Sequence, residues 1–222
     1  MDAVILAGGK GTRLASVSGE SPKVLMPVAG RPFLSHLLDQ VRRAGVSRVI
    51  LSTGYQAERL GEFAAREKVL TCAESEPLGT GGGLRNTLSM LTSTDVLVMN
   101  GDSYVDADLK VLTSAHRGLV TMLLTAVPDT SRYGRVETIN GKVSGYVEKG
   151  AAGPGDINAG VYVIARSVIE SIPTGRAVSL ERDVFPGYIG KGLRAVTGKY
   201  RFIDIGTPES YKEAEAFFAA KS

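Results

Sequence analysis

Short apolar runs alternate with longer amphipathic stretches in the first half of the chain, a pattern that predicts parallel strands joined by helices. Residues 3–6 are all apolar, which predicts a strand buried on both faces. A helix over residues 33–44, ended by Gly45, is predicted by apolar positions at helical spacing, namely Leu34, Leu37, Leu38 and Val41. The rest of this half predicts a strand at 48–53, a helix at 56–66, a strand at 69–73, a glycine-rich turn, a helix at 82–91 and a strand at 95–99.

The second half has a different pattern, because its strands follow one another with little helix between them. Strands are predicted at 120–127, 134–138, 143–147, 160–164 and 200–203, and a closing helix at 208–218. The glycine-rich residues 150–155 form a loop and not a domain linker, because strands of one sheet flank them. Together the halves predict one α/β domain over residues 1–222, with a mostly parallel central sheet and antiparallel additions.

Composition and charge exclude several classes of protein. The 26 basic and 23 acidic residues give a net charge of only +3 and form no basic run, so a nucleic acid partner is not expected. The single cysteine, Cys72, excludes an intramolecular disulfide and is expected to be a small core residue. The N-terminal apolar run is too short for a signal peptide or a membrane span. We therefore expect a cytoplasmic protein without a membrane partner.

A glycine-rich loop with cations follows the first strand: Leu6-Ala7-Gly8-Gly9-Lys10-Gly11-Thr12-Arg13. Glycines let backbone amides approach an anion closely, and Lys10 and Arg13 add positive charge, which suits a triphosphate. A tight turn with solvated cations is the alternative interpretation of the loop alone. The dinucleotide fingerprint fails because Leu14 stands where it needs a glycine, and no stretch has the P-loop spacing.

The loop and a second segment, Ser21-Pro22-Lys23-Val24-Leu25-Met26-Pro27-Val28, together resemble the signature of the sugar-phosphate nucleotidyltransferase family. The resemblance extends over nearly the whole chain, through residues 76–82, 100–102, 132–134, 148–149, 158–162 and 202–208. It implies a single-domain, Rossmann-like nucleotidyltransferase fold. It also implies an enzyme that uses Mg²⁺ to join a nucleoside triphosphate to a sugar 1-phosphate, with release of pyrophosphate.

Such a reaction brings two anions together, so its site must neutralise charge and align the reacting groups. The attacking phosphate is already largely ionised at neutral pH, so a general base is dispensable. His36 and His116, which fall in predicted helical stretches, therefore need no catalytic part. We expect structural or surface roles for both.

Asp102 follows the predicted strand at 95–99, at the end where the crevice of an open α/β sheet lies. The resemblance implies that Asp102 and Asp204 bind Mg²⁺, for which two carboxylates and phosphate oxygens suffice. It also implies that Arg13 and Lys23 hold the phosphates, so the predicted catalytic residues are Arg13, Lys23 and Asp102. Taken alone, each aspartate could be a turn former and each cation a solvated surface charge.

The resemblance implies two sets of binding residues. The predicted nucleotide site consists of Leu6, Ala7, Gly8, Gly9, Gly11, Thr12, Arg13, Lys23, Glu76, Gly79, Thr80 and Asp102. Glu76 could accept hydrogen bonds from a guanine edge, or be a surface residue before Pro77. The predicted sugar-phosphate site consists of Tyr133, Gly134, Glu148, Lys149, Asn158 and Asp204.

Within the family, the short length and the residues around 76, 132 and 202 most resemble members that use GTP and D-glycero-α-D-manno-heptose 1-phosphate in surface polysaccharide synthesis. Mannose 1-phosphate with GTP, or an N-acetylated sugar phosphate with UTP, are alternative substrate pairs. A non-catalytic nucleotide-sugar-binding regulatory module is an alternative of another class. Such a module should have lost a metal aspartate or a phosphate cation, yet Arg13, Lys23, Asp102 and Asp204 are all present. The sequence does not indicate an oligomeric state.

Overall fold

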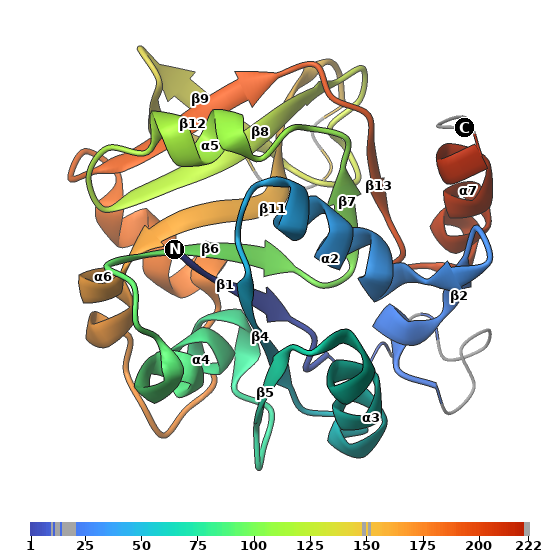
Figure 1. The fold of residues 1–222 in the computed structure, drawn as a ribbon. Coiled ribbons are helices and arrows are strands. Elements are labelled where there is room, and N and C mark those ends of the chain that lie inside the picture. Colours follow the sequence, from blue (N-terminus) through green and yellow to red (C-terminus); the bar gives the residue numbers. More distant parts are fainter. Residues whose placement is uncertain (10, 12–13, 15–20, 148–149, 151, 220–222) are drawn as a thin grey trace.

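A nine-stranded mixed sheet forms the centre of the protein, with strand order β5-β4-β1-β6-β11-β8-β12-β10-β9 (Figure 1). The computed structural model describes residues 1–9, 11, 14, 21–147, 150 and 152–219. Two further pairs of short strands, β13 with β7 and β2 with β3, lie outside this sheet.

The strands within the described residues are β1 (Asp2–Leu6), β2 (Pro27–Val28), β3 (Arg31–Pro32), β4 (Arg48–Thr53), β5 (Leu70–Ala73), β6 (Asp95–Asn100), β7 (Ser103–Val105), β8 (Val120–Val127), β9 (Arg135–Ile139), β10 (Lys142–Val147), β11 (Gly155–Ala165), β12 (Leu193–Gly198) and β13 (Phe202–Asp204). The α-helices are α2 (Phe33–Arg43), α3 (Ala57–Glu67), α4 (Gly79–Asn86), α5 (Lys110–Ala115), α6 (Arg166–Ser171) and α7 (Pro208–Ala219). Three 3₁₀ helices, η2 (Lys23–Leu25), η3 (Thr87–Met90) and η5 (Phe185–Tyr188), and one π-helical turn, η4 (Leu180–Val184), complete the elements. None of the described helices is long and apolar enough to cross a bilayer.

The sheet confirms the predicted α/β class. β5, β4, β1 and β6 are parallel, and their register places Leu6 beside Ser52 and Asn100. β11 then runs antiparallel between β6 and β8, β12 is parallel to β8, and β10 and β9 form an antiparallel edge. The parallel strands therefore end side by side, which brings the segments after β1, β4 and β6 to one edge of the sheet.

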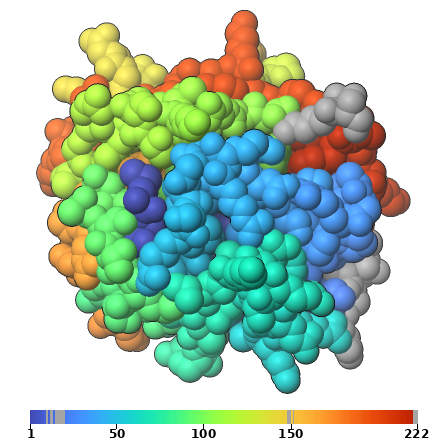
Figure 2. Space-filling view, in the orientation of Figure 1, coloured from blue at the N-terminus to red at the C-terminus, as the bar shows by residue number. Residues whose placement is uncertain are grey.

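Two apolar layers cover the two faces of this sheet. Ala3 and Ile5 of β1 pack in the layer formed with α2 and α3, whereas Val4 packs in the layer formed with α4 and α6. Figures 1 and 2 show α2 and α3 covering one face. Burial of a side chain as large as Val4 or Ile5 contributes about 1.5–3 kcal/mol, so β1 is held from both sides, as predicted.

Several elements differ from the sequence-based predictions. The helix expected at 82–91 begins at Gly79 as α4 and continues as the separate 3₁₀ helix η3. The strand expected at 160–164 is the longer β11, because it continues through a bulge back to Gly155. β7, β12, α5 and α6 were not predicted, because they are short or lack a clear apolar period. These elements form through tertiary packing and not through local preference.

The bulge in β11 lies at Gly160. The pairing with β8 shifts between Asn158 and Tyr162, and Gly160 has a φ of +72°. A Cβ there would lie 2.7 Å from Ser103 Oγ, so the position needs glycine for both conformation and space. The bulge thereby lets β11 approach the segment that follows β6.

The histidines and the cysteine occupy structural positions. On α2, the His36 ring stacks on Phe218 at 4.0 Å and its Nε2 lies 2.9 Å from the Val28 carbonyl oxygen. His116 lies just beyond α5, not inside a helix, and its largely buried ring contacts Thr121 Oγ1 at 2.9 Å. Cys72 is only partly buried, because β5 is an edge strand of the sheet.

Candidate active site

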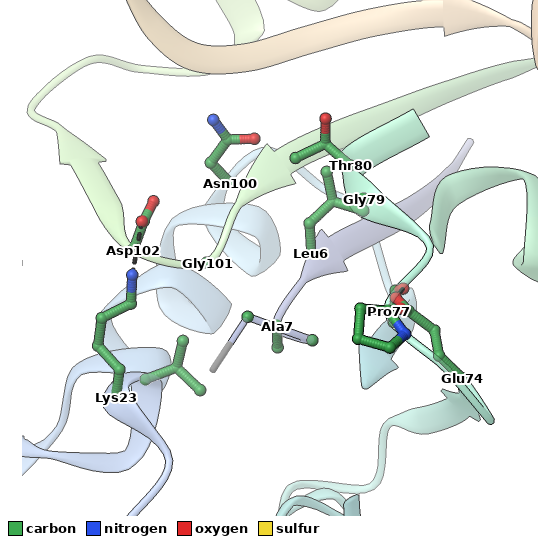
Figure 3. Close-up of a pocket in the computed structure, with 14 residues that line it drawn as sticks. Leu6, Ala7, Lys23, Glu74, Pro77, Gly79, Thr80, Asn100, Gly101 and Asp102 are labelled. Atoms are coloured by element: carbon green, nitrogen blue, oxygen red, sulfur yellow. Dashed lines mark hydrogen bonds and ion pairs between the residues drawn. The ribbon is translucent and has the colours of Figure 1, made fainter. Parts of the chain in front are cut away.

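A cavity of about 290 Å³, here called the strand-end cavity, opens at the carboxyl ends of β1, β4 and β6 (Figure 3). The chain places β4 on one side of β1 and β6 on the other, and ligands of open α/β sheets bind at such a change of strand order. Its described lining residues come from these strand ends, η2, the segment after β5 and the start of α4: Leu6, Ala7, Gly8, Gly9, Lys23, Val24, Ser52, Glu74, Pro77, Gly79, Thr80, Asn100, Gly101 and Asp102.

Most of the residues predicted to bind nucleotide are brought together in this lining, namely Leu6, Ala7, Gly8, Gly9, Lys23, Gly79, Thr80 and Asp102. Gly11 lies against the Lys23 side chain, since a Cβ on Gly11 would be 3.2 Å from Lys23 Cβ. Thr12 and Arg13 lie outside the described residues. The fold thus joins the first loop, residue 23 and residues 79–80, which are far apart in sequence.

Gly8 and Gly9 lack side chains for different physical reasons. A Cβ at Gly8 would lie 2.8 Å from Glu74 Oε1, so a side chain there would displace the Glu74 carboxylate. A Cβ at Gly9 would meet no described protein atom within 4 Å, and its φ is not positive. The described residues therefore leave the space in front of Gly9 open to a ligand.

Replacing Gly9 with alanine should preserve the fold and weaken nucleotide binding, because the added methyl group would occupy space that the protein leaves open. We expect the KM for nucleotide to rise by roughly fivefold or more, with little change in Tm. Gly61→Ala on α3 is the matched control, since a Cβ there also meets nothing, and it should leave KM unchanged. An unchanged KM in Gly9→Ala would place the nucleotide elsewhere.

Lys23 and Asp102 form an ion pair inside the cavity, with Lys23 Nζ 2.7 Å from Asp102 Oδ2 (Figure 3). Lys23 comes from η2 directly after Pro22, and Asp102 follows β6. Their side chains are 13% and 38% exposed, so the lysine is the more buried partner. The pair keeps a cation and a carboxylate at one wall of the cavity, where a phosphate or a metal ion could engage either group.

Asp204 lies on the neighbouring short strand pair. β13 pairs with β7 so that Asp204 is opposite Ser103, and the backbone N–H of Ile205 donates to the Asp102 carbonyl oxygen at 2.8 Å. The Asp204 carboxylate accepts hydrogen bonds from Arg132 at 2.7 and 2.8 Å and from Gly206 N at 2.8 Å. The pairing of β13 with β7 therefore brings the backbone at Asp204 close to the backbone at Asp102. Asp204 does not itself line the strand-end cavity.

Two carboxylates from adjacent strands suit Mg²⁺, which prefers oxygen ligands and usually takes one or two carboxylates together with substrate phosphates. Both carboxylates contact a cation in the structure, Asp102 with Lys23 and Asp204 with Arg132. A divalent ion on Asp102 would compete with Lys23 for the same oxygens. The donor set fits Mg²⁺.

Tyr133 connects the predicted sugar side to Asp204. Its ring packs edge-on against Phe202 at 5.5 Å, and Arg132 lies 5.2 Å from the ring centroid. Burial, together with the charge of Asp204, raises the pKa of Tyr133 to about 12, so the phenol stays protonated at neutral pH. Gly134, with a φ of +80°, donates its N–H to Thr130. Glu148 and Lys149, the other predicted residues of this loop region, lie outside the described residues.

Asn158 belongs to a hydrogen-bond network that the sequence analysis did not foresee. Its Nδ2 donates to the Tyr162 hydroxyl at 2.7 Å, and that hydroxyl donates to Glu181 Oε1 at 3.2 Å. Glu181 Oε2 accepts from Thr80 Oγ1 at 2.9 Å. Glu181, on the π-helical turn η4, thereby connects Asn158 of the predicted sugar side with Thr80 in the strand-end cavity.

Glu181→Ala should lower kcat/KM for both substrates by roughly tenfold, because the fully buried Tyr162 hydroxyl and Thr80 would lose their shared acceptor. Glu181→Gln should recover only part of this loss, because its amide has one accepting oxygen for the Thr80 and Tyr162 hydroxyls, which donate to different oxygens of Glu181. The separate KM values for nucleotide and sugar phosphate are the measurement. A drop in Tm with both KM values unchanged would show that Glu181 only stabilises the fold.

Of the two neighbouring glutamates, Glu74 lines the cavity and Glu76 does not. Glu74 accepts from the backbone N–H of Leu78 at 2.9 Å and from Ser52 Oγ at 3.3 Å, which holds its side chain inward. Glu76 is exposed on the turn before Pro77 and does not line the cavity. The backbone enters a turn after β5, which directs Glu74 toward the cavity and leaves Glu76 exposed.

Comparison with known proteins places the chain among nucleotide-transferring enzymes. A family model described as nucleotidyl transferase matches residues 2–221. A mannose-1-phosphate guanylyltransferase of Mycobacterium tuberculosis is 41% identical over 97% of this chain, which spans only 64% of that relative. A D-glycero-alpha-D-manno-heptose 1-phosphate guanylyltransferase of Aneurinibacillus thermoaerophilus is 33% identical over 97% of both chains.

Solved structures agree with this placement. HddC from Yersinia pseudotuberculosis, in a complex with GMP-PN, has a TM-score of 0.85 and 37% identity, covering 98% of this chain and 99% of that chain. A putative glucose-1-phosphate thymidylyltransferase from Bacillus anthracis has a TM-score of 0.84 at 20% identity, covering 98% of this chain and 94% of the other, and so shares the fold.

Proposed function

The chain belongs to the nucleotidyl transferase family, and we propose that it transfers GMP from GTP to a sugar 1-phosphate, with release of pyrophosphate. The observation that carries this proposal is the strand-end cavity, where a glycine loop, Lys23, Asp102 and Glu74 meet at the change of strand order. Relatives and a structural neighbour that carry guanylyltransferase names or a GMP-PN ligand support the choice of base.

The reaction forms one bond and breaks one. A phosphate oxygen of the sugar 1-phosphate attacks the α-phosphorus of GTP, and the bond from that phosphorus to the bridging oxygen of the β-phosphate breaks. Pyrophosphate leaves with the bonding electrons. No general base is needed, because the attacking phosphate is already ionised. Lys23, together with Arg13, stabilises the negative charge that accumulates on the leaving group.

We assign Asp102 and Asp204 to Mg²⁺, as the sequence predicts. When bound, the ion supplies charge neutralisation at the phosphates. Lys23, no longer paired with Asp102, would then be available to the phosphates. Tyr133, Gly134, Glu148, Lys149 and Asn158 remain the proposed sugar-phosphate residues.

Glu74 is the residue that we propose to read the guanine edge, since a carboxylate accepts from both the ring N–H and the exocyclic amino group of guanine. Glu74→Gln should lower kcat/KM for GTP by roughly 10-fold to 100-fold, because an amide has only one accepting oxygen and its NH2 group faces a second donor. The ratio of GTP to ATP turnover is the measurement. Glu76→Gln, on the exposed turn, is the matched control and should leave this ratio unchanged.

For the sugar, we propose D-glycero-α-D-manno-heptose 1-phosphate, because the heptose-phosphate relatives match this chain over nearly their full length. Mannose 1-phosphate is the second candidate, on the 41% identity of the mycobacterial relative. The two sugars carry the same phosphate group, so the distinction depends on the walls of the sugar site.

A pyrophosphate-release assay with Mg²⁺ tests the proposal by crossing GTP, ATP, CTP, UTP and dTTP with heptose, mannose, glucose and N-acetylated sugar 1-phosphates. We expect GTP with the heptose phosphate to give the highest kcat/KM. A preference for GTP with mannose 1-phosphate would establish the second candidate. No turnover with any pair, from protein shown to be folded, would contradict an enzymatic function and favour a nucleotide-sugar-binding module.

A further inference from the structure

A second cavity, of about 390 Å³, lies beside α4 and is separate from the strand-end cavity in its lining. It is bounded by α4, η3, α6 and the segment after α6, and α4 and α6 pack against each other (Figure 1). Three arginines line it, Arg85, Arg166 and Arg176, together with Leu78, Gly82, Asn86, Leu88, Ser89, Pro173, Thr174 and Gly175. We call it the arginine cavity.

The positive charge of the three arginines is not balanced by acidic side chains in the described lining of this cavity. No Asp or Glu is among its described lining residues, and within the described part of the chain Arg85 and Arg176 form no ion pair. Arg166 is anchored by the Leu91 carbonyl oxygen at 2.6 Å and by Glu170 at 3.0 Å. Guanidinium groups in one cavity repel one another unless an anion lies between them.

The side chain of Arg85 gives independent evidence for a ligand in the arginine cavity. Its Nε is buried and has no hydrogen-bond partner within the described structure, which is uncommon for a charged donor. An arginine in the last turn of α4 suits the negative end of the helix dipole, which accounts for its sequence position. The dipole does not account for Arg176, which comes from the loop before Val178 and faces the same cavity.

We propose that the arginine cavity is a second ligand site, which takes a small molecule that carries phosphate groups. Guanidinium forks match phosphate oxygens with paired hydrogen bonds, and the side chains of Thr174 and Ser89 add polar contacts. Leu78, Leu88 and Pro173 supply apolar surface for an organic part of the ligand.

The site is placed to influence the strand-end cavity. Gly79 and Thr80, in the first turn of α4, line the strand-end cavity, whereas Gly82 and Arg85 of the same helix line the arginine cavity. The loop that carries Arg176 is bonded to the start of this helix, because Val178 N donates to Leu78 O and Gly81 N donates to Val178 O, both at 2.8 Å. A ligand held between Arg85 and Arg176 would thus fix the helix and loop that form one wall of the strand-end cavity.

Isothermal titration calorimetry on the full chain tests this site. Pyrophosphate is titrated, without metal, into the nucleotide-free protein, where it can bind at both the strand-end cavity and the arginine cavity. We expect a second binding event, weakened at least about tenfold in Arg176→Ala and in the Arg85→Ala/Arg176→Ala double variant. Arg117→Ala, which contacts only backbone oxygens near α5, is the matched control and should leave binding unchanged.

Parallel titrations with inorganic phosphate and GDP distinguish the possible sources of the phosphate group. Binding of phosphate and pyrophosphate alike would identify an inorganic ligand, and tighter binding of GDP would identify a nucleotide. The absence of any binding event in the wild type that both arginine variants weaken, whichever probe is used, would overturn the proposal. The measured quantity is the loss of binding when these arginines are replaced. It depends neither on turnover nor on the proposed function. Arg176 is exposed, so its substitution should leave the protein folded.

Discussion

Asp102→Asn should reduce kcat by roughly 100-fold to 1,000-fold at saturating Mg²⁺ while leaving the fold intact. A carboxylate that holds a divalent ion against phosphates contributes several kcal/mol to the transition state, and an amide is a much poorer ligand. The change is isosteric, and the side chain is 38% exposed at the cavity, so Tm should change little. Steady-state pyrophosphate release at several Mg²⁺ concentrations is the measurement, and a raised requirement for Mg²⁺ should accompany the loss.

Asp95→Asn is the matched control for this variant. Asp95 stands at the opposite end of β6, with equal side-chain exposure of 38%, and its carboxylate contacts His116 at 3.5 Å. Turnover should be near normal in this variant. Near-normal turnover in Asp102→Asn as well, with an unchanged Mg²⁺ requirement, would remove Asp102 from the metal site.

Lys23→Ala should also lower kcat by roughly 100-fold to 1,000-fold, with a smaller effect on the KM for sugar phosphate. A fixed cation directed at developing charge contributes most in the transition state, where pyrophosphate leaves. The Lys23 side chain is only 13% exposed, so it is already largely desolvated at the cavity wall. Single-turnover rates with GTP separate this chemical effect from product release.

The Lys23→Ala/Asp102→Asn double variant shows whether the two residues act in one step. Because they contact each other at 2.7 Å, we expect the double variant to lose much less than the product of the two single losses. Fully multiplicative losses would mean that the ion pair has no part in turnover. Lys199→Ala, a lysine outside the described lining of the cavity, should behave like the wild type.

Much of the strand-end cavity could be predicted from local sequence, because its parts are continuous motifs. The loop at Leu6–Gly9 follows an apolar strand, and Asp102 follows another, so the end of a parallel sheet was the expected place for both. Glu74 and Glu181 could not be predicted in this way. Each is a single carboxylate in an unremarkable segment, and its direction depends on hydrogen bonds from Leu78 or from Thr80 and Tyr162.

The amino-acid sequence by itself determined the α/β class, the parallel strands β1, β4, β5 and β6, the large helices, and the family to which the chain belongs. These features follow from periodicity and from motifs of adjacent residues, which are local properties. Only the tertiary structure decided the Glu74 position, the link from Asn158 to Thr80 through Glu181, and the meeting of Arg85, Arg166 and Arg176 in one cavity. These depend on how distant segments pack, because side-chain direction and shared cavities arise only when the strands and helices that carry them are brought together.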